Sequence, residues 1–280
     1  MSNTYGNLPE FKSRMGISGT ADDTDLLETL IWASREIDRR THRQFYVSSG
    51  ASRFFDTEGI DRLYFDDLLV ATTITADSEL DETYDGETWV AGTDHNLIPR
   101  QGFPKLGLQL TADSGKRIPR LTRSYFKIIG DFGYGDGVRA APVDAQGGTY
   151  TVADGTGLVI TIDSGTDPVP GETLLIESEQ LFVESVTAAT SFATPRRGEN
   201  GTTGAAHTAK TANVYRYPPP IVRACYLIAR DFWRARQTGD LIQERFGDYS
   251  YKRAASAESG DIYDQVLAAF ILRNLSGVEA

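Results

Sequence analysis

The 280-residue chain is poor in cysteine and histidine, with one cysteine and three histidines. A single cysteine forms no intrachain disulfide and builds no cysteine-based metal cluster. Cys225 falls within an apolar helical pattern, so we expect a small core residue there rather than a reactive thiol. His42, His95 and His207 lie in three separate regions, none with a second ligand at metal spacing. We expect each histidine to be a surface residue and predict no metal site.

The chain also has no excess of positively charged residues. Lys and Arg number 28 against 39 Asp and Glu, which gives a formal net charge of -11. This balance argues against binding nucleic acid by phosphate neutralisation, and it suits a surface that DNA must slide past. An acidic surface kept for solubility is the plainer interpretation. No apolar run approaches the roughly 20 residues of a membrane span, and residues 1–14 lack the apolar core of a signal peptide. We therefore expect no membrane partner and assembly in a reducing cytosol.

Sequence signatures of catalysis are absent as well. No serine lies in a G-x-S-x-G elbow. The glycine-rich residues 133–137 lack the third glycine of a nucleotide loop and precede no helix pattern, which favours a turn with positive φ. Asp66, Asp67 and the acidic residues 77–85 lack the spacing of a calcium loop, so we interpret them as solvated faces. The sequence therefore predicts no enzyme, no cofactor and no catalytic residue.

The strongest positive signal is an amphipathic helix over residues 24–43. Its apolar stripe recurs at the helical spacing and consists of Leu26, Leu27, Leu30, Ile31, Ser34 and Ile37. Asp22, Asp23 and Asp25 crowd its start, where carboxylates cap open N–H groups and meet the positive end of the dipole. A helix with one apolar face needs partners. Further helical patterns cover residues 8–15, 219–237 and 260–274, so both ends of the chain are expected to close one helical body.

Between these helices the chain has strand-sized segments rich in aromatic and β-branched residues, divided by glycine turns. Residues 44–137 predict a small antiparallel β region. Residues 141–217 predict a separate sandwich or barrel, bounded by prolines that mark stiff exits. The sequence thus predicts an α+β protein. It combines a helical bundle from the N- and C-terminal helices (residues 1–140 and 218–280, with the β region) and an inserted all-β domain (residues 141–217).

Five segments, in this order, resemble the tailed-phage head-tail connector (adaptor) family. They are GISGTADDTDLLETLIWASREIDRRTHRQF, RFFDTEGIDRLYFDDLL, YFKIIGDFGYGDG, PPPIVRACYLIARDFW and FGDYSYKR, which together cover roughly half of the chain. In the family they correspond to the opening helices, two strands joined by a glycine turn, a strand that leads to a glycine turn, the proline-led second helix and the link to the closing helix. The chain departs from the family at residues 140–217, because members commonly run from the glycine turn almost directly into the proline-led helix.

The resemblance implies a structural virion protein of the phage neck, assembled in the host cytoplasm. Such adaptors form a ring, usually of twelve subunits, that docks beneath the portal protein and extends the channel for the genomic DNA. The opposite face of the ring receives a stopper or tail-completion protein. The carboxy-terminal segment of the family commonly inserts between portal subunits. Mapped onto residues 273–280, this makes Arg273, Asn274, Leu275 and Val278 the candidate portal-interface residues.

Two other interpretations remain open. Another neck component, a stopper or tail-completion protein, fits the same context, although long helices near both termini favour the adaptor. A carbohydrate-binding module with hydrolase activity would use an exposed tryptophan and the acidic clusters, and it would release reducing ends from a cell-wall polysaccharide.

Overall fold

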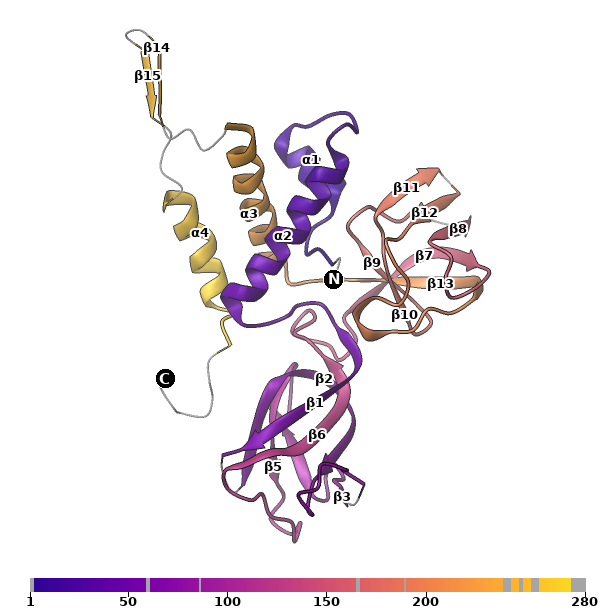
Figure 1. Ribbon diagram of the computed structural model, residues 1–280, viewed down its shortest axis with the longest axis vertical. Helices are drawn as coiled ribbons and strands as arrows, with labels where there is room; N and C mark the ends of the chain where they lie inside the picture. The colour runs from indigo at the N-terminus through magenta and orange to yellow at the C-terminus, as the bar shows by residue number, and fades with distance from the viewer. Residues whose placement is uncertain are drawn as a thin grey trace. The chain divides into compact units, whose positions relative to one another are not determined.

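The computed structural model describes residues 3–58, 61–85, 87–164, 167–188, 190–238, 243–246, 249–252 and 257–272. It is an α+β protein, mostly strand, with helices toward both ends of the chain and two larger antiparallel sheets between them (Figure 1). Contacts divide the chain into two compact units. Unit 1 comprises Met1–His42, Asp144–Glu199 and Thr203–Ile271, and unit 2 comprises Arg43–Val143, Asn200–Thr202 and Leu272–Ala280. The domain limits suggested by the sequence, residues 1–140 with 218–280 and residues 141–217, stay a prediction.

The two N-terminal helices follow the predicted pattern. Helix α1 (Leu8–Met15) carries proline in its first turn and ends at Gly16, whose φ of 68° is left-handed. Helix α2 (Asp23–Thr41) buries one face, which consists of Leu26, Leu27, Leu30, Ala33, Ser34, Ile37 and Thr41. Asp22 occupies its N-cap position without a side-chain cap hydrogen bond, so the predicted capping is wrong at this residue. Acidic residues in the first turn still complement the helix dipole.

Helix α3 (Pro219–Thr238) packs against α2 in unit 1. The Ser34 hydroxyl lies 3.5 Å from the Cys225 sulfur, and an ion pair of 2.7 Å joins Asp25 to Arg236. These pairs show that the two helices run antiparallel. Helices from distant parts of the sequence therefore do lie against each other, as their apolar stripes predict.

Helix α4 (Ala257–Ala268) packs on α3 and α2. Its Leu267 is buried, and Asp264 accepts a hydrogen bond of 2.5 Å from Arg40 at the end of α2. The predicted range, residues 260–274, is wrong at the carboxy-terminal end, because α4 stops at Ala268. Between α3 and α4, strands β14 (Gln243–Phe246) and β15 (Tyr249–Lys252) form an antiparallel pair.

Unit 2 contains the β region predicted for residues 44–137. Its strands are β1 (Ser48–Thr57), β2 (Arg62–Ala76), β3 (Glu87–Thr88), β4 (His95–Ile98), β5 (Lys105–Leu110) and β6 (Thr122–Phe132). They pair antiparallel in the order β1-β6-β2-β5-β4, with β3 beside β2, and Figure 1 shows the sheet curled as a half-barrel. Alternate residues face a core that includes Leu63, Leu108, Phe126 and Phe132. The sheet therefore has one buried face and one face open to solvent.

The glycine-rich residues 133–137 form the turn with positive φ that their spacing predicts. The φ angles are 145° at Gly133, 59° at Gly135 and 79° at Gly137. A Cβ atom at Gly133 would lie 2.2 Å from the carbonyl oxygen of Tyr46, closer than real atoms approach. Only glycine allows this backbone contact. The turn therefore has a structural role in unit 2.

The second large sheet lies in unit 1. Its strands are β7 (Val143–Val152), β8 (Val159–Ser164), β9 (Thr173–Ile176), β10 (Glu179–Phe182), β11 (Ser185–Ala188), β12 (Ser191–Ala193) and β13 (His207–Tyr215). They pair in the order β10-β9-β13-β7-β8-β12-β11. The core of this sheet includes Tyr150, Ile160, Leu174, Leu181, Phe192 and Val214. The strand-sized segments expected in residues 141–217 therefore share one hydrophobic core.

Residues 3–8 connect this second sheet with the helices. The Thr4 hydroxyl donates a hydrogen bond of 2.5 Å to the carbonyl of Gly171, just before β9. The backbone N–H of Tyr5 donates to the Ser34 hydroxyl of α2 at 3.0 Å. Both Thr4 and Tyr5 are buried. A segment with no helical or strand pattern of its own thus contributes to the packing of unit 1.

Asp38 of α2 lies beside this segment in an unusual electrostatic setting. Burial raises the pKa of its carboxyl to about 7, although the Arg35 guanidinium at 3.2 Å and the donated hydrogen bond from the Tyr5 hydroxyl oppose that rise. A carboxyl whose pKa is higher in the folded state binds its proton more tightly there. Its contribution to stability is therefore complete below the unfolded pKa of about 4 and is lost as the pH rises through 7.

We expect Asp38→Asn to remove this part of the pH dependence. The free energy of unfolding of the wild type, minus that of the variant, should be larger at pH 5 than at pH 8. The physical reason is that only the wild type must ionise the buried Asp38 carboxyl over this range, whereas every other buried carboxyl is common to both proteins. Urea unfolding followed by circular dichroism at both pH values measures the difference. Equal differences at pH 5 and pH 8 would contradict the expectation.

Candidate protein-binding surfaces

The described residues contain no cluster of side chains with the geometry of a metal site. No group of three or more His, Cys, Asp or Glu side chains converges on a point where an ion could sit, within the ranges given above. Cys225 is fully buried, and burial raises the pKa of its thiol to about 11. It is the core residue that the helical pattern predicts. A protonated and inaccessible thiol is not a nucleophile at neutral pH.

The histidines were predicted at the surface, and this prediction is wrong for two of them. His42 is exposed and ends α2 with a φ of 54°, but His95 and His207 are each only 2% exposed. Burial lowers the pKa of His95, with Asp94 opposing the shift. His207 lies between two carboxylates, 2.8 Å from Glu179 and 3.0 Å from Glu177. These two partners are distant from His207 in the sequence, so no local pattern predicts its burial.

Glu179 is the centre of a hydrogen-bonded network in the second sheet. Its carboxylate is fully buried and accepts two hydrogen bonds from Arg197, at 2.8 and 2.6 Å. The N–H groups of Gly198 and Ala205 each donate to it at 3.0 Å. Burial opposes its charge, but the bonds from Arg197, Ala205, His207 and Gly198 outweigh burial and hold its pKa below the ordinary range. Every partner of the Glu179 carboxylate comes from the second sheet or its loops, so the network ties β10 and β13 to the loop after β12.

The acidic residues also differ from the solvated faces that their composition predicts. Asp67 is 3% exposed and accepts a hydrogen bond of 2.5 Å from Arg43, and burial raises its pKa to about 6. Asp77 is 5% exposed and accepts the N–H groups of Asp81 and Glu82, at 3.1 and 2.9 Å. It therefore shapes the loop of residues 77–85. The prediction is wrong for Asp67 and Asp77, whereas Asp66 and the rest of this loop are at least partly exposed.

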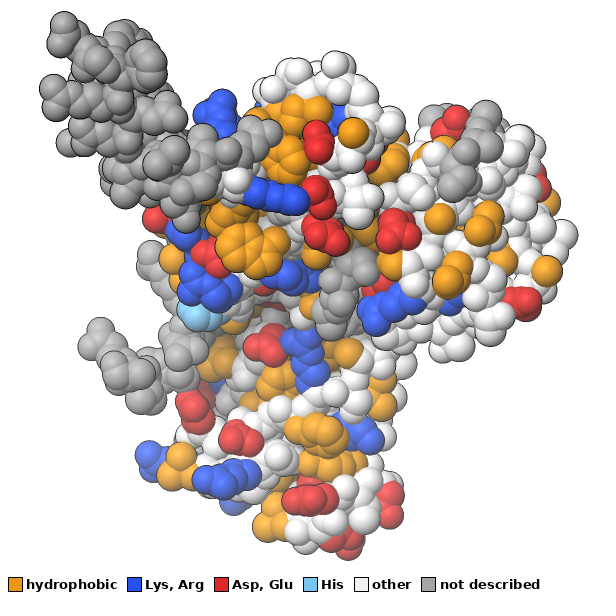
Figure 2. All heavy atoms as spheres, turned by 45° about the horizontal axis from the view of Figure 1, so that its top comes forward, with side chains coloured by type: hydrophobic (Ala, Val, Ile, Leu, Met, Phe, Trp, Pro, Cys, Tyr) orange, Lys and Arg blue, Asp and Glu red, His pale blue; other side chains and the backbone are white. Residues whose placement is uncertain are grey.

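A surface suited to protein binding lies along α2 and α3. Trp32 is 57% exposed, and its ring packs against that of Phe232. The ion pair between Asp25 and Arg236 lies along the same seam. In Figure 2 hydrophobic side chains lie among acidic and basic ones over the helices. We call the patch formed by Trp32, Phe232, Asp25 and Arg236 the Trp32 surface. An exposed aromatic beside charged groups is typical of protein contacts, where tryptophan often contributes most of the energy.

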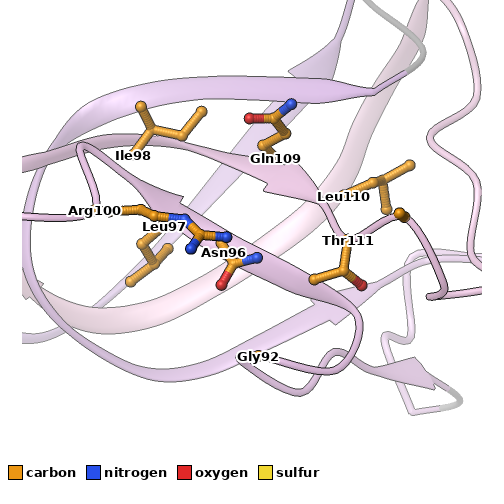
Figure 3. A pocket seen from close by; sticks show the side chains of 9 residues that line it. Gly92, Asn96, Leu97, Ile98, Arg100, Gln109, Leu110 and Thr111 are labelled. Atoms are coloured by element: carbon orange, nitrogen blue, oxygen red, sulfur yellow. The ribbon is translucent and has the colours of Figure 1, made fainter.

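A hollow of about 610 Å³ lies on β4 and β5 of unit 2 (Figure 3). Its polar lining consists of Asn96, Arg100, Gln109 and Thr111, and its apolar lining consists of Leu97, Ile98, Leu110 and Ala112. Asn96 and Gln109 are register partners across the two strands. Figure 3 shows Arg100 extending along β4 toward Asn96. The lining contains hydrogen-bond donors and one positive charge but no carboxylate, so it suits a negatively charged group.

The predicted portal-interface residues, Arg273, Asn274, Leu275 and Val278, lie outside the described residues. The hollow on β4 and β5 has no counterpart among the sites predicted from the sequence. Its only sequence signal is an amide on each of two short strands, and the strand register that brings Asn96 opposite Gln109 is not visible in the sequence. The Trp32 surface had a partial signal, an aromatic residue off the apolar stripe of α2.

Comparisons with protein-family models, curated proteins and solved structures found no match to this chain. Among the described residues, none of the helices combines the length and the apolar character that a bilayer crossing requires.

Proposed function

We propose that the protein is a head-tail connector (adaptor) of a tailed phage, which forms a ring beneath the portal and extends the DNA channel. In this proposal α1 to α4 form the helical body, and residues 141–217 form an inserted β domain. The observation that carries the proposal is the antiparallel packing of α2 on α3, two helices separated by most of the chain. The adaptor assignment requires the helices from the two ends of the chain to pair in this way.

The electrostatic character of the chain supports the same role. A channel lining must not hold the duplex, and a net charge of -11 provides few partners for phosphates. The adaptor acts by binding and positioning, without catalysis, and its partners are identical subunits, the portal and a stopper or tail-completion protein. The Trp32 surface suits the contact between neighbouring subunits, because a half-exposed tryptophan gains most when a second protein covers it.

Electron microscopy of the negatively stained protein, alone and mixed with a portal protein, tests the proposal. We expect closed rings of about twelve subunits, bound coaxially to the portal. Particles that remain monomeric at high concentration and do not bind the portal would contradict the proposal. Salt-sensitive binding of duplex DNA by the purified protein would also count against it, since a lumen that holds DNA would stop the genome.

We expect Trp32→Ser to weaken assembly without unfolding the chain. Loss of an aromatic hot spot costs about 2 kcal/mol or more of binding, equivalent to roughly a thirtyfold weaker association. Sedimentation velocity over a concentration series measures the shift from rings to monomers. Leu158→Ser is the matched control, because Leu158 is 47% exposed but lies outside the Trp32 surface. Equal assembly of wild type and Trp32→Ser would remove this surface from the interface.

A further inference from the structure

The hollow on β4 and β5 combines groups that together recognise a carboxylate next to an aliphatic side chain. Arg100 provides a guanidinium with its fork of N–H donors, and Asn96 and Gln109 provide amides. Arg100 is exposed, and its guanidinium makes no ion pair with any residue that the structure describes. Ile98 and Leu110 provide aliphatic area beside these donors. Such a site prefers a ligand that is acidic and apolar at once.

The loop of residues 77–85, also in unit 2, presents that combination. Leu80 is 64% exposed, with Glu79 and Glu82 close to it in sequence, both exposed. Neither glutamate carboxylate has a hydrogen bond or an ion pair within the described part of the chain. Leu80 and Glu82 have left-handed φ angles of 59° and 62°. A leucine held exposed in a disfavoured conformation indicates a position that serves something other than stability.

The conformation of this loop is fixed by a buried residue. The two carboxylate oxygens of Asp77 accept the N–H groups of Asp81 and Glu82, and Asp77 itself is almost fully buried. The loop is therefore organised before it meets a partner, which lowers the entropic cost of binding. The residues of this loop are absent from the lining of the hollow in the same chain.

We propose that the hollow around Arg100 binds the loop of residues 77–85 from a second copy of the chain. The carboxylates of Glu79 and Glu82 would meet Arg100 and the amides, and Leu80 would cover Ile98 and Leu110. The hollow and the loop are different surfaces, so the contact is heterologous. Each subunit offers its hollow to one neighbour and its loop to another. Contacts of this type continue from subunit to subunit and close into a ring when the rotation allows. This inference rests on the proposed ring and names one of its contacts.

Charge exchange between two variants tests the contact. Arg100→Glu alone places carboxylates opposite carboxylates, and Glu79→Arg with Glu82→Arg in one chain places cations opposite Arg100. We expect each variant to associate about tenfold or more weakly than the wild type. An equimolar mixture of the two variants should associate again, because every hollow then finds a loop of opposite charge. Mass photometry of the full-length chains measures all four samples.

The outcomes separate the contact from the proposed function. If the wild type forms rings and both variants form them equally well, the contact is wrong and the adaptor proposal stands. The contact is also wrong if the variants are weakened but their mixture is not restored. If the wild type remains monomeric at every concentration, both the contact and the ring are contradicted. Circular dichroism of each variant distinguishes weakened association from unfolding.

Discussion

Glu179→Ala should destabilise the second sheet by about 3–5 kcal/mol, the usual cost of removing one partner of a buried ion pair. The carboxylate of Glu179 is fully buried, and the Arg197 side chain is only 5% exposed. Removal of the Glu179 carboxylate leaves the Arg197 guanidinium, the His207 ring and two backbone N–H groups without their acceptor. Arg197 also donates to the carbonyls of Asp154 and Gly157, so the loop after β12 should loosen together with the turn before β8.

Urea unfolding at pH 7 measures the loss, and amide hydrogen exchange locates it in β9, β10 and β13. Glu184→Ala is the matched control, because Glu184 follows β10 and its side chain is exposed. Substitutions at such exposed positions change stability by about 0.5 kcal/mol or less. If Glu179→Ala and Glu184→Ala had equal stability, the structural role of the buried network would be wrong.

The second large effect is expected for Leu30→Ala in α2. Leu30 is fully buried, and its carbonyl accepts the weak hydrogen bond of the Cys225 thiol across the α2–α3 contact, at 3.9 Å. Removing the side chain leaves a cavity between the two helices. Buried leucine-to-alanine changes of this type cost about 2–5 kcal/mol. Thermal unfolding followed by the helical circular dichroism signal measures this loss.

Glu28→Ala provides the comparison on the same helix. Glu28 is exposed, and substitutions at such positions change stability by about 0.5 kcal/mol or less. If the loss at Leu30 were no greater than the loss at Glu28, α2 would not be packed through its apolar stripe. The tryptophans add a second readout, because Trp32 and Trp233 lie on α2 and α3, and their fluorescence should report the separation of the helices.

The helices could be predicted because their information is local. In α2 the apolar residues recur at a period that places them on one face, and proline and Gly16 mark the limits of α1. The positive φ angles of Gly133, Gly135 and Gly137 were predictable for the same reason, since glycine spacing is a local signal. The limit of α4 was missed because its apolar pattern continues beyond Ala268. Helix ends depend on caps and on tertiary contacts as well as on periodicity.

The buried polar residues could not be predicted from local patterns. His207 is buried because Glu177 and Glu179 face both of its ring nitrogens, and these residues lie about 30 positions away. Asp67 is buried because Arg43 reaches it from 24 positions away. Composition alone makes such residues look solvated, since most charged residues are exposed. The hollow depends in the same way on the strand register that pairs Asn96 with Gln109.

Helices from opposite ends of the chain fold against each other, and a cysteine cross-link between α2 and α3 detects this packing. Ser34→Cys adds a thiol where the hydroxyl lies 3.5 Å from the Cys225 sulfur, and the chain then holds only these two cysteines. Oxidation of the variant while it refolds from urea, when both thiols are accessible, should form an intrachain disulfide, detected by a mass loss of two hydrogens and faster migration in a non-reducing gel. Arg39→Cys, on an exposed position of α2, should not cross-link. Absence of the Ser34→Cys disulfide, or equal cross-linking from both positions, would contradict the packing of α2 on α3 and with it the adaptor proposal.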